Sequence, residues 1–133
     1  MKKKTKIIGE NNMLSFAIIM LLAGIGIPIM AAMTSSLGKH LSSPVAASAF
    51  AFFIAFCISL LALMIADKSF VKQIPSAPKY LFVAGAFVAF YVLSISFVAP
   101  HFGIGNAIFF VLLGQLLSAA IIDHYGLFGA QVN

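Results

Sequence analysis

Charged residues are scarce in this sequence, and their scarcity excludes a water-soluble fold. They make up 8% of the chain, whereas hydrophobic residues make up 62% and the mean hydropathy is +1.12. A soluble domain usually carries about 25% charged residues. A chain of 133 residues cannot bury this much apolar surface within itself, so its solvent must be the lipid bilayer.

Arginine is absent and cysteine occurs once, and this composition excludes several common functions. Cys57 lies in an apolar run, where it cannot form an intramolecular disulfide and is expected to be a small buried apolar side chain. The cysteine, histidine and acidic residues do not have the spacing of metal ligands, so we expect neither a metal site nor a cofactor. The net charge of +5 comes from lysines at the ends of apolar runs, without the basic stripe of a nucleic-acid-binding protein, so we expect no nucleic acid partner.

Long uncharged stretches fill most of the remaining sequence. They cover residues 11–38, 41–66, 80–100 and 102–122. Each is long enough to cross a bilayer core about 30 Å thick, which takes about 20 helical residues. In lipid no water satisfies the backbone, so helices are required. The sequence predicts an all-α integral membrane protein, with one transmembrane domain over residues 1–133 and a four-helix bundle. The expected spans are 14–35, 44–66, 80–99 and 104–122.

The predicted connections are a short turn at 37–43, a polar loop at 67–79 and a very tight turn at 100–103. Ser42 or Ser43 can cap the second helix, because Pro44 suits its first turn. Pro75 and Pro78 are expected to end one helix and to begin the next.

The lysines indicate the orientation in the membrane. Seven of the eight must share one side, and they are Lys2, Lys3, Lys4, Lys6, Lys68, Lys72 and Lys79. Only Lys39 falls on the other side. The positive-inside rule then places both termini and the middle loop in the cytoplasm. A cleaved signal peptide is the competing interpretation of residues 1–33, but a signal sequence has a shorter apolar core, and three more spans follow.

Small residues recur at four-residue spacing and predict close packing between helices. The rows are Gly24, Pro28, Ala32 and Ser36; Ala47, Ala51, Ala55 and Ser59; Gly85 and Ala89; and Gly114 and Ser118. Pro28 lies in the middle of its span and is expected to bend the helix. The bend is either a structural feature or a hinge whose freed carbonyl groups line a cavity.

Few polar side chains lie within the spans, and these are the candidate site residues. Gln115 is near the centre of the fourth span, where its amide either joins two helices or contacts a substrate. Asp123 and His124 close that span, and the carboxylate can bind a coupling ion or pair with Lys79 or Lys68. Thr34, Pro28 and Ser118 complete the candidate substrate-binding set.

No catalytic constellation is visible, so we do not expect an enzyme. A nucleotide-binding glycine loop is also absent from the sequence, so any transport must be secondary or depend on a partner.

Three stretches carry a resemblance to a known family. They are GIPIMAA at 26–32 with LGKHLSSP at 37–44, APHFG at 99–103, and GQLLS at 114–118 with IDHYGLFG at 122–129. From about Gly24 onward the sequence resembles the YdcZ-type inner-membrane family, a half-size branch of the drug/metabolite transporter superfamily with EamA-like relatives. It departs from that family at Met30 and Thr34, where the family pattern has glutamine and asparagine.

The resemblance implies a secondary transporter, or a transporter subunit, that moves a small molecule across the bacterial inner membrane as a dimer. The resemblance also implies five helices in each family member, so this chain is expected to be a five-helix half without its last helix. The lysine bias favours a partner chain of opposite orientation over an antiparallel homodimer. The alternative is a non-transporting membrane assembly partner, or a truncated and degenerate transporter fragment.

Overall fold

Helices make up nearly all of the regular structure, as the apolar stretches predict. The computed structural model describes the backbone of residues 2–132 and the side chains of residues 9 and 11–132. The long helices are α1 (Lys2–His40), α2 (Pro44–Ile65), α3 (Ala84–Phe102) and α4 (Ile104–Tyr125). Short 3-10 helices are η1 (Lys68–Lys72), η2 (Ile74–Ser76), η3 (Lys79–Val83) and η4 (Leu127–Gly129). Four segments are long and apolar enough to span a membrane, which confirms the predicted fold class.

The connection between α1 and α2 is shorter than predicted, because α1 continues to His40. The helix ends in a Schellman motif in which Ser42 takes a left-handed conformation, with φ 51°. In this motif the Ser43 N–H donates to the carbonyl of Gly38 at 2.9 Å. Ser43 then caps α2, because its Oγ accepts from the Ala46 N–H at 3.1 Å. The predicted cap is thus confirmed at Ser43.

The polar connection between α2 and α3 also differs from the prediction. Pro75 does not end α2, which stops at Ile65, ten residues earlier. The chain from Lys68 to Val83 instead winds through three 3-10 helices, and Pro75 lies in the second of them. Pro78 caps η3 as expected of a residue that begins a helix, and η3 continues directly into α3 as one candidate span, Lys79–Phe102.

The predicted turn at 100–103 is confined to one residue. Pro100 lies inside α3, which continues to Phe102. The fixed φ of proline is compatible with a helix, so the ring by itself does not reverse the chain. Gly103 makes the reversal with φ 88° and ψ 142°, a conformation that glycine adopts without steric cost. Its N–H donates to the carbonyl of Ala99, and its own carbonyl accepts from the N–H of Ala107.

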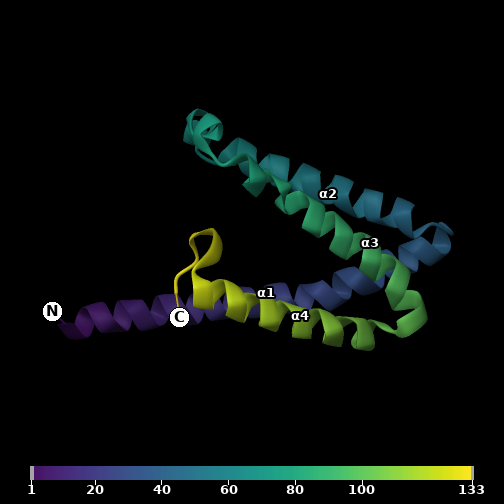
Figure 1. Ribbon diagram of the computed structural model, residues 1–133, viewed down its shortest axis with the longest axis horizontal. Helices are drawn as coiled ribbons and strands as arrows, with labels where there is room; N and C mark the ends of the chain where they lie inside the picture. The colour runs from purple at the N-terminus through teal and green to yellow at the C-terminus, as the bar shows by residue number, and fades with distance from the viewer. Residues whose placement is uncertain (1, 133) are drawn as a thin grey trace.

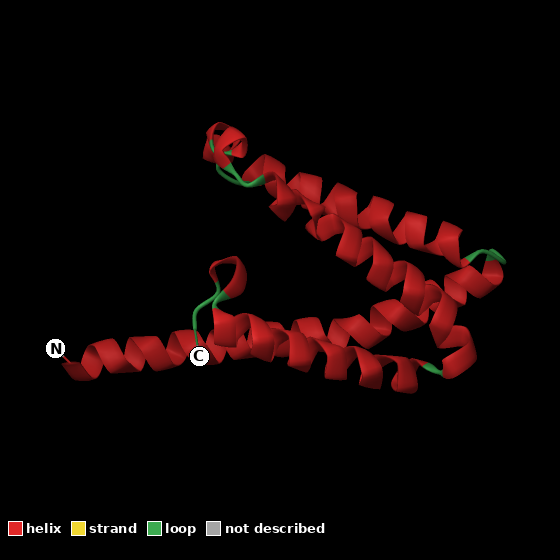
Figure 2. Cartoon of the chain, viewed as in Figure 1, coloured by secondary structure: helices red, strands yellow, loops and turns green. Residues whose placement is uncertain are grey.

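The four long helices form two arms that meet at one end (Figure 1). One arm contains α2 and α3, and the other contains α4, which overlaps α1 in this view and contacts it. We call the end that carries Leu41–Ser43 and Gly103 the joined end. Figure 2 shows that the loops lie at the helix ends and that the arms diverge away from the joined end. α1 remains continuous through Pro28, and its last part turns toward α2 and α3.

The core consists of small side chains within about three turns of the joined end. The buried residues are Ala31, Thr34, Ser35, Gly38, Ala47, Ser48, Val92, Ile95, Ser96, Ala99 and Ala107. Ser48 of α2 donates to the Oγ of Ser96 in α3 at 3.0 Å, and Ser96 donates to its own helix at the carbonyl of Val92 at 2.7 Å. This buried pair joins α2 and α3.

The predicted rows of small residues are only partly used for packing within the chain. Ala47 is fully buried, but Ala55 and Ser59 of the same row are exposed. In α1 the buried row is Ala31 and Ser35, one position away from the predicted row. Gly114 and Ser118 of α4 are exposed as well. Because residues 31–36 are nearly all small, the spacing could not distinguish one row from its neighbour.

Gly38 allows α1 and α2 to approach most closely, and this gives a stability prediction. A Cβ atom at Gly38 would lie 3.3 Å from the Cα of Pro44, whereas a Cβ at Gly26 would meet nothing within 4 Å. Gly38→Leu is therefore expected to lower the free energy of unfolding by about 1–3 kcal/mol relative to the matched variant Gly26→Leu. Circular dichroism of both variants in detergent, during titration with SDS, measures this difference. Equal stability would show that the contact is not tight.

Candidate functional site

Two candidate polar residues lie on the open surface of α4. Gln115 and Ser118 are both exposed, and no hydrogen bond joins either side chain to another described residue. Large apolar side chains surround them on the same helix, including Leu116 at 69% and Leu117 at 59% exposure. An amide that faces lipid leaves its donors and acceptor unpaired, which costs several kcal/mol. The side chains of Gln115 and Ser118 therefore need a hydrogen-bonding partner, which the described part of the chain does not supply.

Asp123 and His124 lie in the last turn of α4. The Asp123 side chain is half-buried, and no ion pair joins it to Lys68 or Lys79 in the described part of the chain. The ring of His124 is exposed and packs edge-on against Tyr125, with 4.9 Å between the ring centroids and an interplanar angle of 83°. The Asp123 carboxylate thus lies at the C-terminal end of α4, and neither Lys68 nor Lys79 neutralises its charge.

Gly126 explains the shape of the chain just after this pair. It ends α4 in the left-handed conformation, with φ 59° and ψ 36°. A Cβ atom there would lie 2.8 Å from the Cγ2 of Val132, so the following segment folds back tightly over it. The glycine of the IDHYGLFG stretch therefore fixes how α4 ends and where the chain goes beyond Asp123 and His124.

Pro28 and Thr34 of α1 have different environments. Thr34 is 5% exposed, and its hydroxyl donates to the carbonyl of Met30 at 2.8 Å. It also lines an apolar groove of about 430 Å³ between α1 and α2, together with Phe50 and Ile54. Pro28 is half-buried. The hydroxyl proton of Thr34 is therefore used inside its own helix.

Helix geometry gives the depth of each candidate. At about 1.5 Å per residue, Pro28 and Gln115 both lie about 18 Å along their own helices from the joined end. Thr34 lies about 9 Å and Asp123 about 30 Å from that end. Pro28 and Gln115 are nevertheless not level, because Ala31 of α1 and Ala107 of α4 share one buried cluster. Gln115 lies eight residues beyond Ala107, about 12 Å, whereas Pro28 lies three residues before Ala31, about 5 Å. The structure separates Thr34 from Asp123 by about 20 Å, so one small molecule cannot contact both at once.

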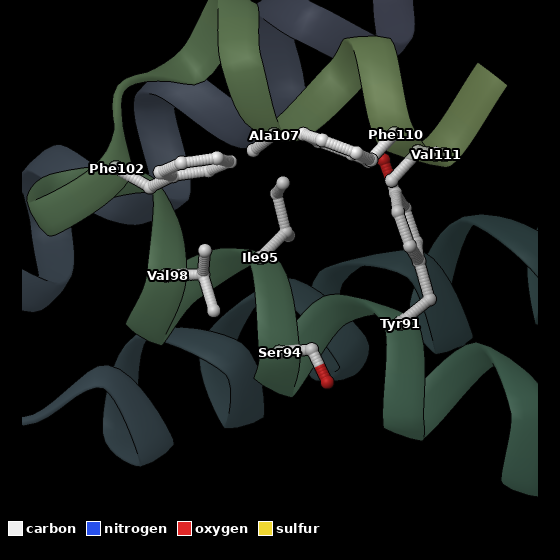
Figure 3. Close-up of a pocket in the computed structure, with 8 residues that line it drawn as sticks. All are labelled: Tyr91, Ser94, Ile95, Val98, Phe102, Ala107, Phe110 and Val111. Atoms are coloured by element: carbon white, nitrogen blue, oxygen red, sulfur yellow. The ribbon is translucent and has the colours of Figure 1, made fainter. Parts of the chain in front are cut away.

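A cavity between α3 and α4 was not predicted from the sequence. It measures about 230 Å³ and is lined by Tyr91, Ser94, Ile95, Val98, Phe102, Ala107, Phe110 and Val111. The hydroxyl of Tyr91 is buried and has no hydrogen-bond partner. Figure 3 shows the Tyr91 side chain reaching from α3 to α4 beside Val111, whereas the hydroxyl of Ser94 points away from the cavity.

The chemistry of this cavity suits a small apolar molecule with one hydrogen-bonding group. Its lining is apolar apart from the Tyr91 hydroxyl, which can both donate and accept. Tyr91 is the one tyrosine in the middle of a predicted span, since Tyr80 and Tyr125 lie at or beyond span ends. The isolated position of Tyr91 was the one feature of the sequence that could have indicated this cavity. That its hydroxyl lacks a hydrogen-bond partner follows only from the positions of the neighbouring residues.

Comparison with known proteins agrees with this architecture. The family described as "Putative inner membrane exporter, YdcZ" matches residues 15–133, which include most of the first apolar span and all of the other three. No curated protein matches the chain, and no solved structure matches it. The family match confirms the resemblance inferred from residues 26–44, 99–103 and 114–129, and it indicates a transporter rather than an enzyme. The chain is therefore a multi-pass inner membrane protein that belongs to the YdcZ family.

Proposed function

We propose that the chain is one subunit of a secondary transporter that moves a small molecule across the bacterial inner membrane as a dimer. The observation that carries the proposal is the exposure of Gln115 and Ser118 on α4. A polar surface at this depth is stable only when a second subunit, a substrate or both supply hydrogen bonds. Family membership supports the same conclusion, because the family is described as an inner membrane exporter.

The arrangement of the arms supports a dimer. The two arms pack together at the joined end and diverge beyond it (Figure 2). Between Phe53 and Ile65, every residue of α2 except the half-buried Cys57 is exposed. The unused small residues Ala55 and Ser59 lie in this part of α2 and would let a partner helix approach closely. The uneven lysine distribution favours a partner of opposite orientation, because superfamily members work as two inverted halves.

Each candidate residue has a role in the proposal. Gln115 contacts the substrate from α4, and Pro28 leaves one backbone carbonyl of α1 without its helical donor. Ser118 extends the same polar surface toward the end of α4. Asp123 binds the coupling ion, and His124 beside it can carry a proton. We assign no substrate contact to Thr34, because it is 5% exposed and its hydroxyl donates to Met30.

Transport by reconstituted protein tests these roles. Liposomes that contain the chain, alone or with a co-purified partner, receive a proton or Na⁺ gradient and a panel of amino acids and cationic drugs. We expect gradient-driven flux of at least one compound. Gln115→Ala removes a hydrogen bond worth about 1 kcal/mol and should raise the half-saturating concentration about fivefold. Asp123→Asn should abolish coupling to the gradient, because the amide cannot bind the ion.

Two substitutions outside the spans serve as matched controls. Gln73→Ala and Asp67→Asn change the same side-chain types in the connection between α2 and α3 and should leave flux unchanged. Failure of the wild-type protein to move any compound would contradict transport. Equal flux in Asp123→Asn and Asp67→Asn would contradict the coupling role.

Cysteine cross-linking tests the dimer. Gln115 lies near the middle of α4, so a parallel and an antiparallel partner both bring it to a similar depth. In a Cys57→Ser background, an oxidised species of doubled mass from Gln115→Cys identifies a second copy as the partner, whereas the oppositely oriented partner chain that the lysines favour is expected to co-purify with the protein. Leu61→Cys on the exposed part of α2 is the comparison position. A chain that stays monomeric at both positions, and that co-purifies with no second subunit, would rule out the dimer.

The orientation is also a proposal, in which both termini and the η1–η3 connection face the cytoplasm. The lysine distribution supports it. In the Cys57→Ser background, an impermeant maleimide should label His40→Cys in intact spheroplasts and Ser69→Cys only after permeabilisation. The reverse pattern would place the connection outside.

A further inference from the structure

The connection between α2 and α3 carries a concentrated positive charge at one end of the apolar helices. Three of its residues are lysines, Lys68, Lys72 and Lys79, and all three are exposed. They are held on short 3-10 helices rather than on an extended loop. Because η1 begins three residues after α2 ends, this charge stands at the level where lipid headgroups meet the membrane interior.

The single carboxylate of this connection does not neutralise the lysines. Oδ1 of Asp67 accepts the backbone N–H of Ser69 at 3.2 Å and caps η1. No ion pair links it to a lysine within the part of the chain that the structure describes. The connection therefore presents uncompensated ammonium groups, to which an anionic partner is complementary.

An apolar groove lies directly beside one of these lysines. It measures about 210 Å³ and is lined by Leu60, Leu63, Met64, Lys68, Phe70 and Val71. The first three come from the last two turns of α2, and the others come from η1. Phe70 is 36% exposed and Val71 is 55% exposed, so η1 presents apolar side chains next to its charge. We call this feature the α2–η1 groove.

We infer that the α2–η1 groove binds an anionic phospholipid, with an acyl chain against Leu63 and Phe70 and the phosphate at Lys68. Lys72 and Lys79 add charge around the headgroup. A zwitterionic lipid offers the same acyl chain without a net charge, and a free phosphate offers charge without the chain. Only an anionic lipid supplies both an acyl chain for the groove and a negative charge for the lysines. The inference does not depend on transport and applies whether the chain moves a substrate or not.

Native mass spectrometry of the purified full-length protein tests the inference. Phosphatidylglycerol and phosphatidylcholine with identical acyl chains are titrated into the detergent-solubilised protein. We expect phosphatidylglycerol adducts at the lower lipid concentration. The triple variant Lys68→Gln, Lys72→Gln, Lys79→Gln should raise the half-saturating concentration of phosphatidylglycerol roughly 100-fold, about fivefold for each lysine. Binding of phosphatidylcholine should not change.

Control variants separate charge from folding and from the groove. Lys39→Gln removes a lysine in the last turn of α1, near the start of α2 and a full helix length from the groove, and should have no effect. Replacing the three lysines with arginine should keep the preference, and circular dichroism verifies that each variant is helical. Phe70→Ser should weaken both lipids equally, because it alters the groove and not the charge.

Several outcomes would overturn the inference. One is an unchanged preference for phosphatidylglycerol in a helical triple glutamine variant. A loss of preference in Lys39→Gln equal to that in the triple variant is another. Displacement of the lipid by millimolar inorganic phosphate would identify a simple anion site. A doubled protein mass that disappears in Phe70→Ser would mean that a second copy, and not a lipid, occupies the groove.

Discussion

The close approach of α1, α2 and α3 at the joined end is the constraint on which the rest of this structure depends. Ser48 and Ser96 form a hydrogen bond between α2 and α3 at 3.0 Å, and Gly38 lets α1 reach the start of α2. Lipid provides no hydrophobic drive for this contact, so dispersion between small side chains and the buried hydroxyl pair must hold it. Ser96 donates its proton to the carbonyl of Val92. The single proton of Ser48 lies within reach of both the Ser96 Oγ and the carbonyl of Pro44, so neither hydroxyl is left unpaired.

A core made of small residues at one end leaves the remaining surface for other partners. Large apolar side chains along α2 and α3 face outward, where lipid solvates them. The same exposure is unfavourable for Gln115 on α4, and the half-buried Asp123 carries its charge at the end of that helix. The joined end therefore holds the buried core, and the diverging arms carry the candidate site residues Gln115, Ser118 and Asp123.

The features that the sequence predicted well are local ones. Four spans follow from the length of uncharged stretches, because lipid forces every such stretch into a helix. The Ser43 cap follows from its place before Pro44. The predicted turn at 100–103 was too long for a local reason as well, because α3 continues through Pro100 to Phe102 and the chain reverses only at Gly103. The family resemblance came from short stretches, and the match over residues 15–133 confirms it.

By itself, the sequence determined that lipid is the solvent, that four helices cross it and which polar residues lie at depth. Only the tertiary structure decided which row of small residues is buried, because residues 31–36 offer several equivalent rows and packing selects Ala31 and Ser35. It also decided that Thr34 is enclosed, that Gln115 is open and that the Tyr91 hydroxyl lacks a partner. Helix formation in lipid depends on each segment alone, whereas burial depends on where the other helices lie.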